Sequence, residues 1–166
     1  MKPGEPLFLA LTLVAAVGCG VMAGVFFAFS SFVMTALGRL PPDAGITAMQ
    51  AVNVAVINPL FFAALFGTAA VCAVLSVFSI PAWRHPGCAY LPAGALLYLG
   101  GTMLVTLVCN VPLNDALARA VPGDPAASRV WAAYLTDWTA WNHVRTAAAF
   151  AAAVAFSLAY RWQPAV

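Results

Sequence analysis

The sequence predicts an all-α membrane protein whose four transmembrane helices form one bundle, with a short amphipathic helix and a lid loop on the side opposite the termini. Hydrophobic residues make up 64% of the 166 residues and charged residues only 7%, whereas a soluble domain carries roughly 25% charged residues. The mean hydropathy is +0.94, and four apolar runs are long enough to cross a hydrocarbon core of about 30 Å. We therefore expect residues 1–166 to form a single integral membrane domain in contact with the lipid bilayer.

The charges and the cysteines exclude several classes of protein. Seven Lys and Arg residues against five Asp and Glu residues give a net charge of +2, which is too small and too scattered for a nucleic-acid surface. We therefore expect no nucleic acid as a partner. The four cysteines stand singly, without C-x-x-C spacing, and this indicates neither a disulfide framework nor a thiolate metal site.

The first predicted span, residues 7–37, is unusually long. It extends about 46 Å, beyond a hydrocarbon core of about 30 Å, so it must tilt or project from the membrane. Small residues recur along it at four-residue intervals, which allows another helix to approach closely. We expect this stripe to pack inside the bundle, and a seam in a homo-oligomer is the alternative. The stripe consists of Ala16, Gly20, Gly24 and Ala28.

Three further spans, at residues 59–80, 90–111 and 138–160, place both termini on one side of the membrane. The connection on that side, Pro81–Gly87, is short, whereas the two connections on the other side are long. Basic residues nearly balance between the two sides, but those on the terminal side lie closer to the span ends, where the positive-inside rule is most reliable. We therefore expect a multi-pass protein of a bacterial cytoplasmic membrane with cytoplasmic termini.

Both long connections are expected to cover the bundle. Residues 38–58 contain the helix start Pro41-Pro42-Asp43, followed by apolar residues at helical spacing, and they predict an amphipathic helix. Residues 112–137 contain a turn at residues 122–125, followed by Trp131 and Tyr134. This second connection is the predicted lid loop.

Polar residues gather at the start of the fourth span. Asn142, His143, Arg145 and Thr146 occupy an arc of about 160° around the helix, and we expect them to face the bundle interior together. Ionisable residues inside a membrane are costly and mark functional sites. The alternative is that Arg145 extends to the interface and that His143 is an ordinary interfacial residue.

The third span offers a matching polar face, because Thr102, Thr106, Asn110 and Asn114 recur every four residues. We expect the threonines to make interhelical hydrogen bonds. The two asparagines lie at the same end of the bundle as His143, and we expect them to contact a ligand.

Other residues reach the same end of the bundle. Asn53 and Asn58 are expected either to bind a ligand or to shape the start of the second span. Phenylalanines, among them Phe29, thicken this half of the bundle and would wall a pocket for a flat apolar aromatic molecule. Packing in the core or against lipid is the alternative for these rings.

We expect no metal and no haem. His85 lies in the short connection at the opposite end from His143, so the two histidines cannot share an ion. One histidine with nearby asparagines is a poor ligand set for zinc, copper or iron, and a haem held by His143 alone is still less favoured.

Two polar motifs stand near span ends: Asn110-Val-Pro-Leu-Asn114-Asp115 and Trp138-x-x-Trp141-Asn142-His143-x-Arg145-Thr146. In a four-span chain of this length, this pair of motifs resembles the anthrone oxygenase-like membrane family. The segments 24–32, 49–53 and 58–59 are similar to that family too. The resemblance implies oxidation of an aromatic polyketide, an anthrone, to a quinone with O2 as co-substrate and without metal or flavin.

The residue types suggest how such a reaction would proceed. Triplet O2 reacts slowly with closed-shell molecules, but a substrate carbanion or phenolate can give it one electron. We expect His143 to act as general base and Arg145 to stabilise the enolate oxygen. The expected hydrogen-bond donors to this oxygen are Asn142, Asn110 and Asn114, and the rings expected to stack on the substrate are Trp138 and Trp141.

Two other functions remain open. The polar cluster fits a non-catalytic membrane protein that binds a quinone, a lipid headgroup or a partner protein. A proton-coupled transporter is the third hypothesis, and the lack of an acidic residue well inside a span counts against it.

Overall fold

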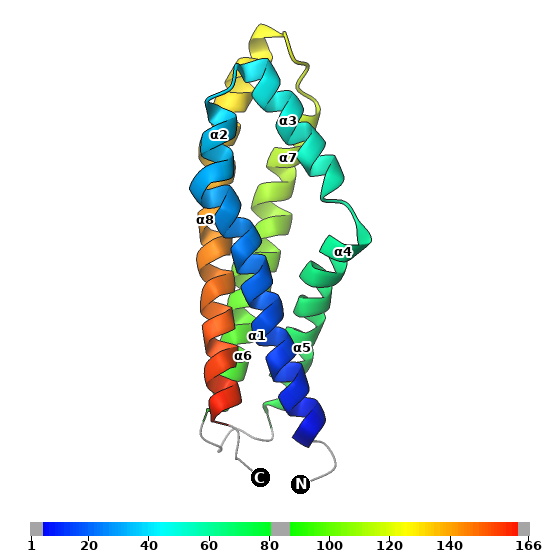
Figure 1. The fold of residues 1–166 in the computed structure, drawn as a ribbon, viewed down its shortest axis with the longest axis vertical. Helices are drawn as coiled ribbons and strands as arrows, with labels where there is room; N and C mark the ends of the chain where they lie inside the picture. The colour runs from blue at the N-terminus through cyan, green and yellow to red at the C-terminus, as the bar shows by residue number, and fades with distance from the viewer. Residues whose placement is uncertain (1–4, 81–86, 163–166) are drawn as a thin grey trace.

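The structure is a computed structural model that describes residues 5–80 and 87–162. Within these ranges the chain forms helices and turns and no strand. Four helices are long and apolar enough to span a membrane, so the predicted four-span architecture is confirmed (Figure 1). They cover Pro6–Gly38, Pro59–Phe78, Tyr90–Ala118 and Pro125–Arg161. Apart from Gly87, the predicted short connection Pro81–Gly87 lies outside the described residues.

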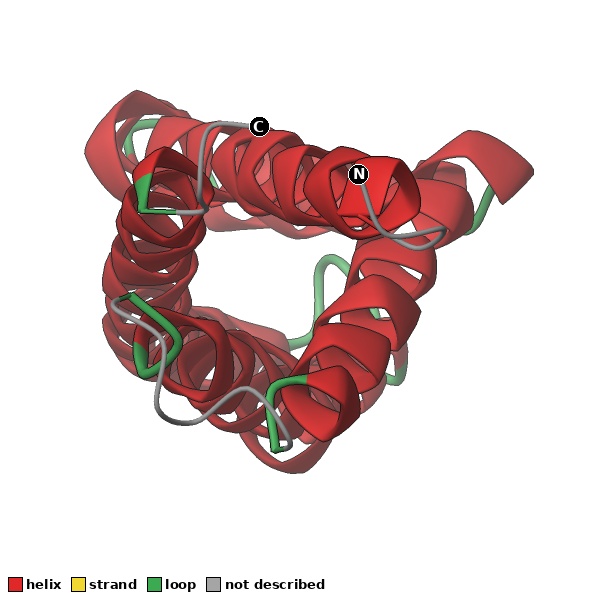
Figure 2. Ribbon diagram, turned by 90° about the horizontal axis from the view of Figure 1, so that it is seen from below, coloured by secondary structure: helices red, strands yellow, loops and turns green. Residues whose placement is uncertain are grey.

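The first three spans combine α-helical and π-helical segments, whereas the fourth is one α-helix. The first span consists of α1 (Glu5–Ala28), η1 (Phe29–Val33) and α2 (Met34–Gly38). The second consists of α4 (Pro59–Phe62), η2 (Ala63–Gly67) and α5 (Thr68–Phe78). The third consists of α6 (Tyr90–Leu96), η3 (Leu97–Leu104), η4 (Thr106–Asn110) and α7 (Val111–Ala118), and the fourth is α8 (Pro125–Arg161). Figure 2 shows the four spans arranged around a common axis.

The π-helical segments explain how residues four positions apart can stay on one face. An α-helix has 3.6 residues per turn, so such residues drift around it, whereas a π-turn contains more residues. Thr102 and Asn110 are buried, and Thr106 and Asn114 are half-buried. The polar face predicted for the third span is therefore real, and η3 and η4 keep it in line.

The predicted amphipathic helix is α3 (Pro42–Ala55), and it covers the end of the bundle remote from the chain termini (Figure 1). Pro42 stands in its first turn, where proline is favoured. The face of α3 that turns towards the bundle is buried and consists of Gly45, Ile46 and Met49. A Cβ atom at position 45 would lie only 2.7 Å from the Trp131 ring, so a glycine at this position lets α3 press directly against α8.

The predicted lid loop is mostly helical, because α7 extends to Ala118 and α8 begins at Pro125. The Asp124 side chain caps α8 by accepting a hydrogen bond from the Ala126 amide at 2.8 Å. The intervening turn is tied to α3, because the Gly123 amide donates to Asp43 Oδ1 at 2.8 Å. The cap is therefore a helical layer, in which packing of Trp131 and its neighbours stabilises turns that hydropathy alone assigns to a loop.

The two glycines of the small-residue stripe face outward, so the prediction that the stripe packs inside the bundle is wrong for them, whereas Ala16 is half-buried against the core. Gly20 and Gly24 are exposed, and a Cβ atom added at either position would have no neighbour within 4 Å. The inward face of α1 instead carries Cys19, Met22 and Phe26. The reason is that α1 is apolar all round, so spacing alone does not select the face that turns inward. The homo-oligomer seam stays a prediction.

The second span diverges from the first towards the cap. Its α5 segment packs against α1 and α6, and η2 still contacts α1. By contrast, the backbone of α4 comes close only to η2 of its own span, although its Phe61 side chain packs against the hydrophobic core. The first two spans therefore form a V that opens towards α3 (Figure 1).

Candidate functional site

The candidate site is centred on Arg145 of α8, whose side chain is only 5% exposed. Its guanidinium carbon lies 4.4 Å from the centre of the Phe26 ring and 5.1 Å from that of the Trp138 ring. Both distances are within the range of cation–π attraction, which is strongest where water is excluded. The aromatic rings of α1 and α8 thus hold a cation inside a membrane-spanning bundle.

Neutral oxygens complete the contacts of this guanidinium. Nη2 donates to Asn142 Oδ1 at 2.7 Å, and Nη1 donates to Thr106 Oγ1 at 3.3 Å. Asn142 is itself anchored to the first span, because its Nδ2 donates to the Phe26 carbonyl and to Ser30 Oγ, each at 2.7 Å. The first, third and fourth spans therefore meet at Arg145.

Two π-helical segments supply this network. Ser30 belongs to η1, and Thr106 and Asn110 belong to η4. Short π-helical stretches occur frequently at functional sites, because they shift residues off the regular α-helical positions. Sequence reasoning missed Ser30 as a partner of the site and counted Phe26 only among the phenylalanines that would wall the pocket. The signal was a four-residue repeat in the first span that places both of them on the inward face: Met22, Phe26, Ser30 and Met34.

Arg145 has no carboxylate to compensate its charge within the described part of the chain. The aspartates of that part are all exposed, and the described hydrogen bonds of the guanidinium go to neutral oxygens. These aspartates are Asp43, Asp115, Asp124 and Asp137. Removing an ion from water costs several kcal/mol unless it is paired. The site therefore contains a positive charge that an anionic ligand would balance.

Three polar atoms around this charge are buried and have no hydrogen-bond partner among the described residues. They are Arg145 Nε and Trp138 Nε1, both donors, and Asn110 Oδ1, an acceptor. Asn110 is held in place because its Nδ2 donates to the Trp138 carbonyl at 3.1 Å. Unpaired buried polar atoms are uncommon in native proteins and require an explanation. Each of the three is therefore a candidate contact for a ligand, two as donors and one as an acceptor.

An aromatic column connects this centre to the cap. Trp131, Tyr134 and Trp138 stack in sequence, with ring centres 5.8 and 5.7 Å apart and interplanar angles of 14° and 20°. Phe29 meets Trp138 edge-on at 5.7 Å. This arrangement confirms that Phe29 and Trp138 lie beside the polar centre, and it offers flat apolar surfaces next to a cation.

The two outer asparagines of the prediction meet at Tyr134 rather than at Arg145. The Tyr134 hydroxyl donates to Asn114 Oδ1 at 2.8 Å and accepts from Asn53 Nδ2 at 3.5 Å. Both residues are half-buried. They fix the aromatic column to α3 and α7, and so they support the site from the cap side.

Three predicted roles do not agree with the geometry. His143 is exposed on the outer face of α8, and Trp141 is 42% exposed, because the buried stripe of α8 is narrower than the arc of about 160° that we expected. Asn142 cannot be the expected oxyanion donor, because its amide nitrogen is occupied by Phe26 and Ser30. For Asn58, the structure agrees with the second of its two expected roles, because this exposed residue caps the second span by accepting from the Phe61 amide at 2.9 Å.

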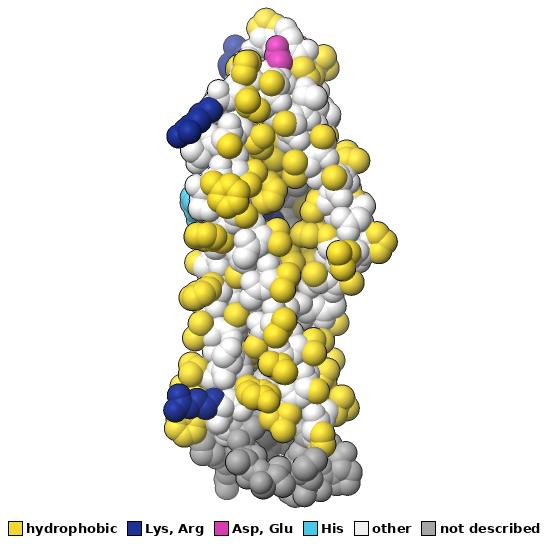
Figure 3. Space-filling model, viewed as in Figure 1, with side chains coloured by type: hydrophobic (Ala, Val, Ile, Leu, Met, Phe, Trp, Pro, Cys, Tyr) yellow, Lys and Arg dark blue, Asp and Glu magenta, His cyan; other side chains and the backbone are white. Residues whose placement is uncertain are grey.

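The hollow of the molecule that leads to this region lies between the first span and α4. Figure 3 shows this face hollowed in its upper half, with a small area of basic side chain visible inside. Arg145 is the only buried Lys or Arg among the described residues. As for metals, no three His, Cys, Asp or Glu side chains come together in residues 5–80 and 87–162.

A sequence model of the anthrone oxygenase family matches residues 59–155 of the chain. No curated protein and no solved structure matches it. The matched region covers more than half of the chain and contains Asn110, Trp138, Asn142 and Arg145. On this match, the chain belongs to the anthrone oxygenase family.

Proposed function

We propose that the protein is a membrane-embedded oxygenase that uses O2 to oxidise a phenolic or polycyclic aromatic substrate towards a quinone. The observation that carries this proposal is the buried, uncompensated charge of Arg145 between two aromatic rings. A substrate carbanion or phenolate would supply the missing negative charge, while its rings would lie against apolar walls. O2 is the co-substrate, and the substrate anion itself supplies the electrons, so no metal or organic cofactor is invoked.

The reaction converts a methylene carbon and O2 into a carbonyl carbon and water. The substrate first loses a proton, and the resulting anion gives one electron to O2. The substrate radical and superoxide then combine, the peroxide takes up a proton, and loss of water leaves the carbonyl group. The protein's contribution is to favour the anion, because preorganised donors in a site without water stabilise a developing oxyanion.

In this proposal the residues have distinct roles. Arg145 and Trp138 Nε1 donate to the substrate oxyanion, and Asn110 Oδ1 accepts from a substrate hydroxyl. Asn142 is a positioning residue, because it orients the guanidinium through its 2.7 Å hydrogen bond. His143 has no part in the site, so in this proposal the substrate gives its proton to water, and the positive charge of Arg145 favours this ionisation by lowering the pKa of the substrate.

The test is O2 uptake by the purified protein with an anthrone as substrate. We expect uptake of one O2 per anthrone oxidised, above the spontaneous rate measured with the Arg145→Met variant at the same pH and lipid content. Uptake by wild type that equals the rate with this variant would refute the oxygenase proposal. A bound quinone or anionic lipid without O2 uptake would instead support the alternative of a non-catalytic binding protein.

A further inference from the structure

We infer that the aromatic substrate reaches Arg145 sideways from the hydrocarbon layer, through the opening between the first and second spans. This inference rests on the proposed function for the chemistry of the ligand, an apolar ring system with one ionisable oxygen. It concerns how that ligand arrives, which the family match does not address.

The route from the aqueous side is blocked by the packed cap. A ligand that came from the aqueous side would have to pass the cap, where Ile46, Met49, Leu117 and Tyr134 are fully buried. The cap is also fastened by hydrogen bonds, because Gln50 Nε2 donates to the carbonyls of Leu117 and Ala120 at 2.9 Å each. Opening this layer would break well-packed contacts and expose apolar surface to water.

The side of the bundle is hollowed between the first and second spans, in the half of the molecule that contains Arg145 (Figure 3). The first and second spans separate at α4, whose backbone comes close to η2 of its own span and to no element of the first span. The hollow in Figure 3 lies in this gap, and basic surface is visible inside it. Phe32 of η1 and Leu60 of α4, one from each of the two separating spans, are 61% and 81% exposed, and such apolar side chains are more stable in lipid than in water.

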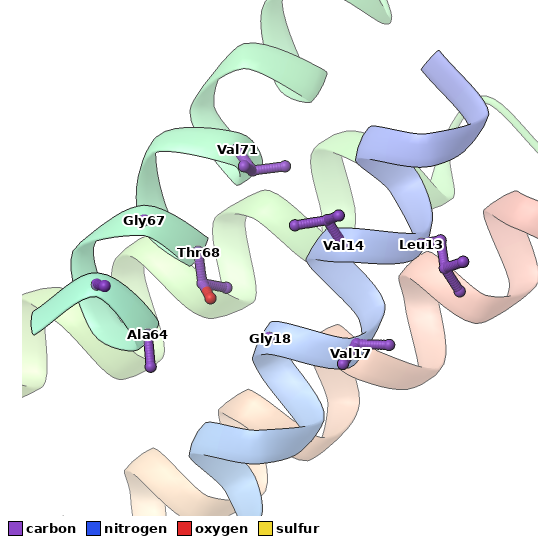
Figure 4. A pocket seen from close by; sticks show the side chains of 9 residues that line it. Leu13, Val14, Val17, Gly18, Ala64, Gly67, Thr68 and Val71 are labelled. Atoms are coloured by element: carbon purple, nitrogen blue, oxygen red, sulfur yellow. The ribbon is translucent and has the colours of Figure 1, made fainter. Parts of the chain in front are cut away.

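An apolar groove lies along the same two spans and begins at Ala63, the residue that follows α4. The groove has a volume of about 530 Å³ and runs between α1 and the segments η2 and α5 (Figure 4). Gly18 and Gly67 contribute no side chain, and the other lining residues are mainly small or aliphatic. This volume is in the range of pockets that hold drug-sized molecules. A ring compound dissolved in the bilayer could lie in this groove before it moves to Arg145.

The experiment measures binding of a hydroxyanthraquinone to the protein in lipid nanodiscs by stopped-flow quenching of tryptophan fluorescence. Two tryptophan substitutions narrow the opening. Gly67→Trp acts in the groove, where an added Cβ has no neighbour within 4 Å, and Ala63→Trp acts at an exposed lining position next to α4. The matched controls are Gly20→Trp and Ala70→Trp, which are exposed positions outside the groove.

We expect Gly67→Trp and Ala63→Trp to slow association and dissociation alike by roughly tenfold or more, within the range that mutants of one interface show, while Kd stays the same. The controls should keep the wild-type rates. The association rate should also follow the mole fraction of ligand in the lipid rather than its concentration in water.

Three results would overturn the inference: unchanged rates in both groove variants, equal slowing in the controls, or no binding of the probe to wild type. Because the binding assay needs no turnover, failure of the lateral-access inference can be distinguished from failure of the proposed function. Slowed binding without any O2 uptake would leave lateral access supported and the oxygenase proposal refuted.

Discussion

Replacing Arg145 by methionine should abolish activity and leave the fold intact. Methionine retains a long, flexible side chain that can fill the space between Phe26 and Trp138, but it has no charge and no donor. The position is therefore suited to separating a functional charge from a structural one. If Arg145 serves a ligand, its removal relieves the protein of a buried charge that the fold itself does not need.

The expected change in the free energy of unfolding follows from the contacts of the guanidinium. Removing a cation from the middle of a membrane helix gains about 3 kcal/mol on insertion scales. The loss of two cation–π contacts costs about 3 kcal/mol in total, and the unpaired Asn142 Oδ1 costs about 2 kcal/mol. New sulfur–aromatic contacts return about 1 to 2 kcal/mol. The sum is close to zero, so the variant should unfold near the wild-type temperature.

The catalytic effect should be much larger. Loss of one preorganised oxyanion donor lowers kcat by about 10² to 10³, and we expect at least this loss of O2 uptake. Arg145→Lys keeps the charge but loses the planar guanidinium, so its O2 uptake should lie between that of wild type and that of Arg145→Met. The assays are O2 uptake with an anthrone and thermal unfolding in the same detergent. A drop in stability of about 3 to 5 kcal/mol, as for a broken buried ion pair, would show that Arg145 is structural.

Three other substitutions test the roles of single residues. His143→Ala should retain wild-type O2 uptake because His143 is exposed on the outer face of α8, and a loss of about tenfold or more would restore it as the general base. Asn142→Asp should raise KM, since a carboxylate 2.7 Å from Arg145 Nη2 would compensate the charge meant for the substrate, although the variant loses the hydrogen bond that Asn142 Nδ2 donates to the Phe26 carbonyl; an unchanged KM would contradict the anion proposal. Gly24→Leu should fold with wild-type stability, because a Cβ at this position meets nothing within 4 Å, and a marked destabilisation of the monomer in thermal unfolding would place this face inside the bundle. Size-exclusion chromatography of the same variant tests the predicted homo-oligomer seam.

Hydropathy predicts the number of spans well but not the ends of the third and fourth. Each apolar run crosses the bilayer independently, so its core can be found from composition alone. The helices continue past Val111 and begin before Trp138 because residues such as Trp131 pack against α3 instead of lipid. A contact between segments about 80 residues apart leaves no signal in a hydropathy window.

The candidate site was predictable in its polar residues and not in their orientation. Asn110, Trp138 and Arg145 were expected together and lie together. His143 was placed with them because a helix wheel gives the angles between residues but not the width of the buried stripe. That width depends on where Phe26 and Ser30 of the first span make contact, and this depends in turn on the π-helical segment η1.

The number of residues in the π-helical segment η4 determines which way the rest of the third span faces. Each π-turn contains more residues than an α-helical turn, so loss of a single residue from Thr106–Asn110 would turn everything beyond it by about 100° around the axis. The span would still be long enough to cross the membrane, but Asn114 would leave Tyr134. A related chain that is one residue shorter in this segment would therefore keep the four-span fold and present a different set of side chains to Arg145.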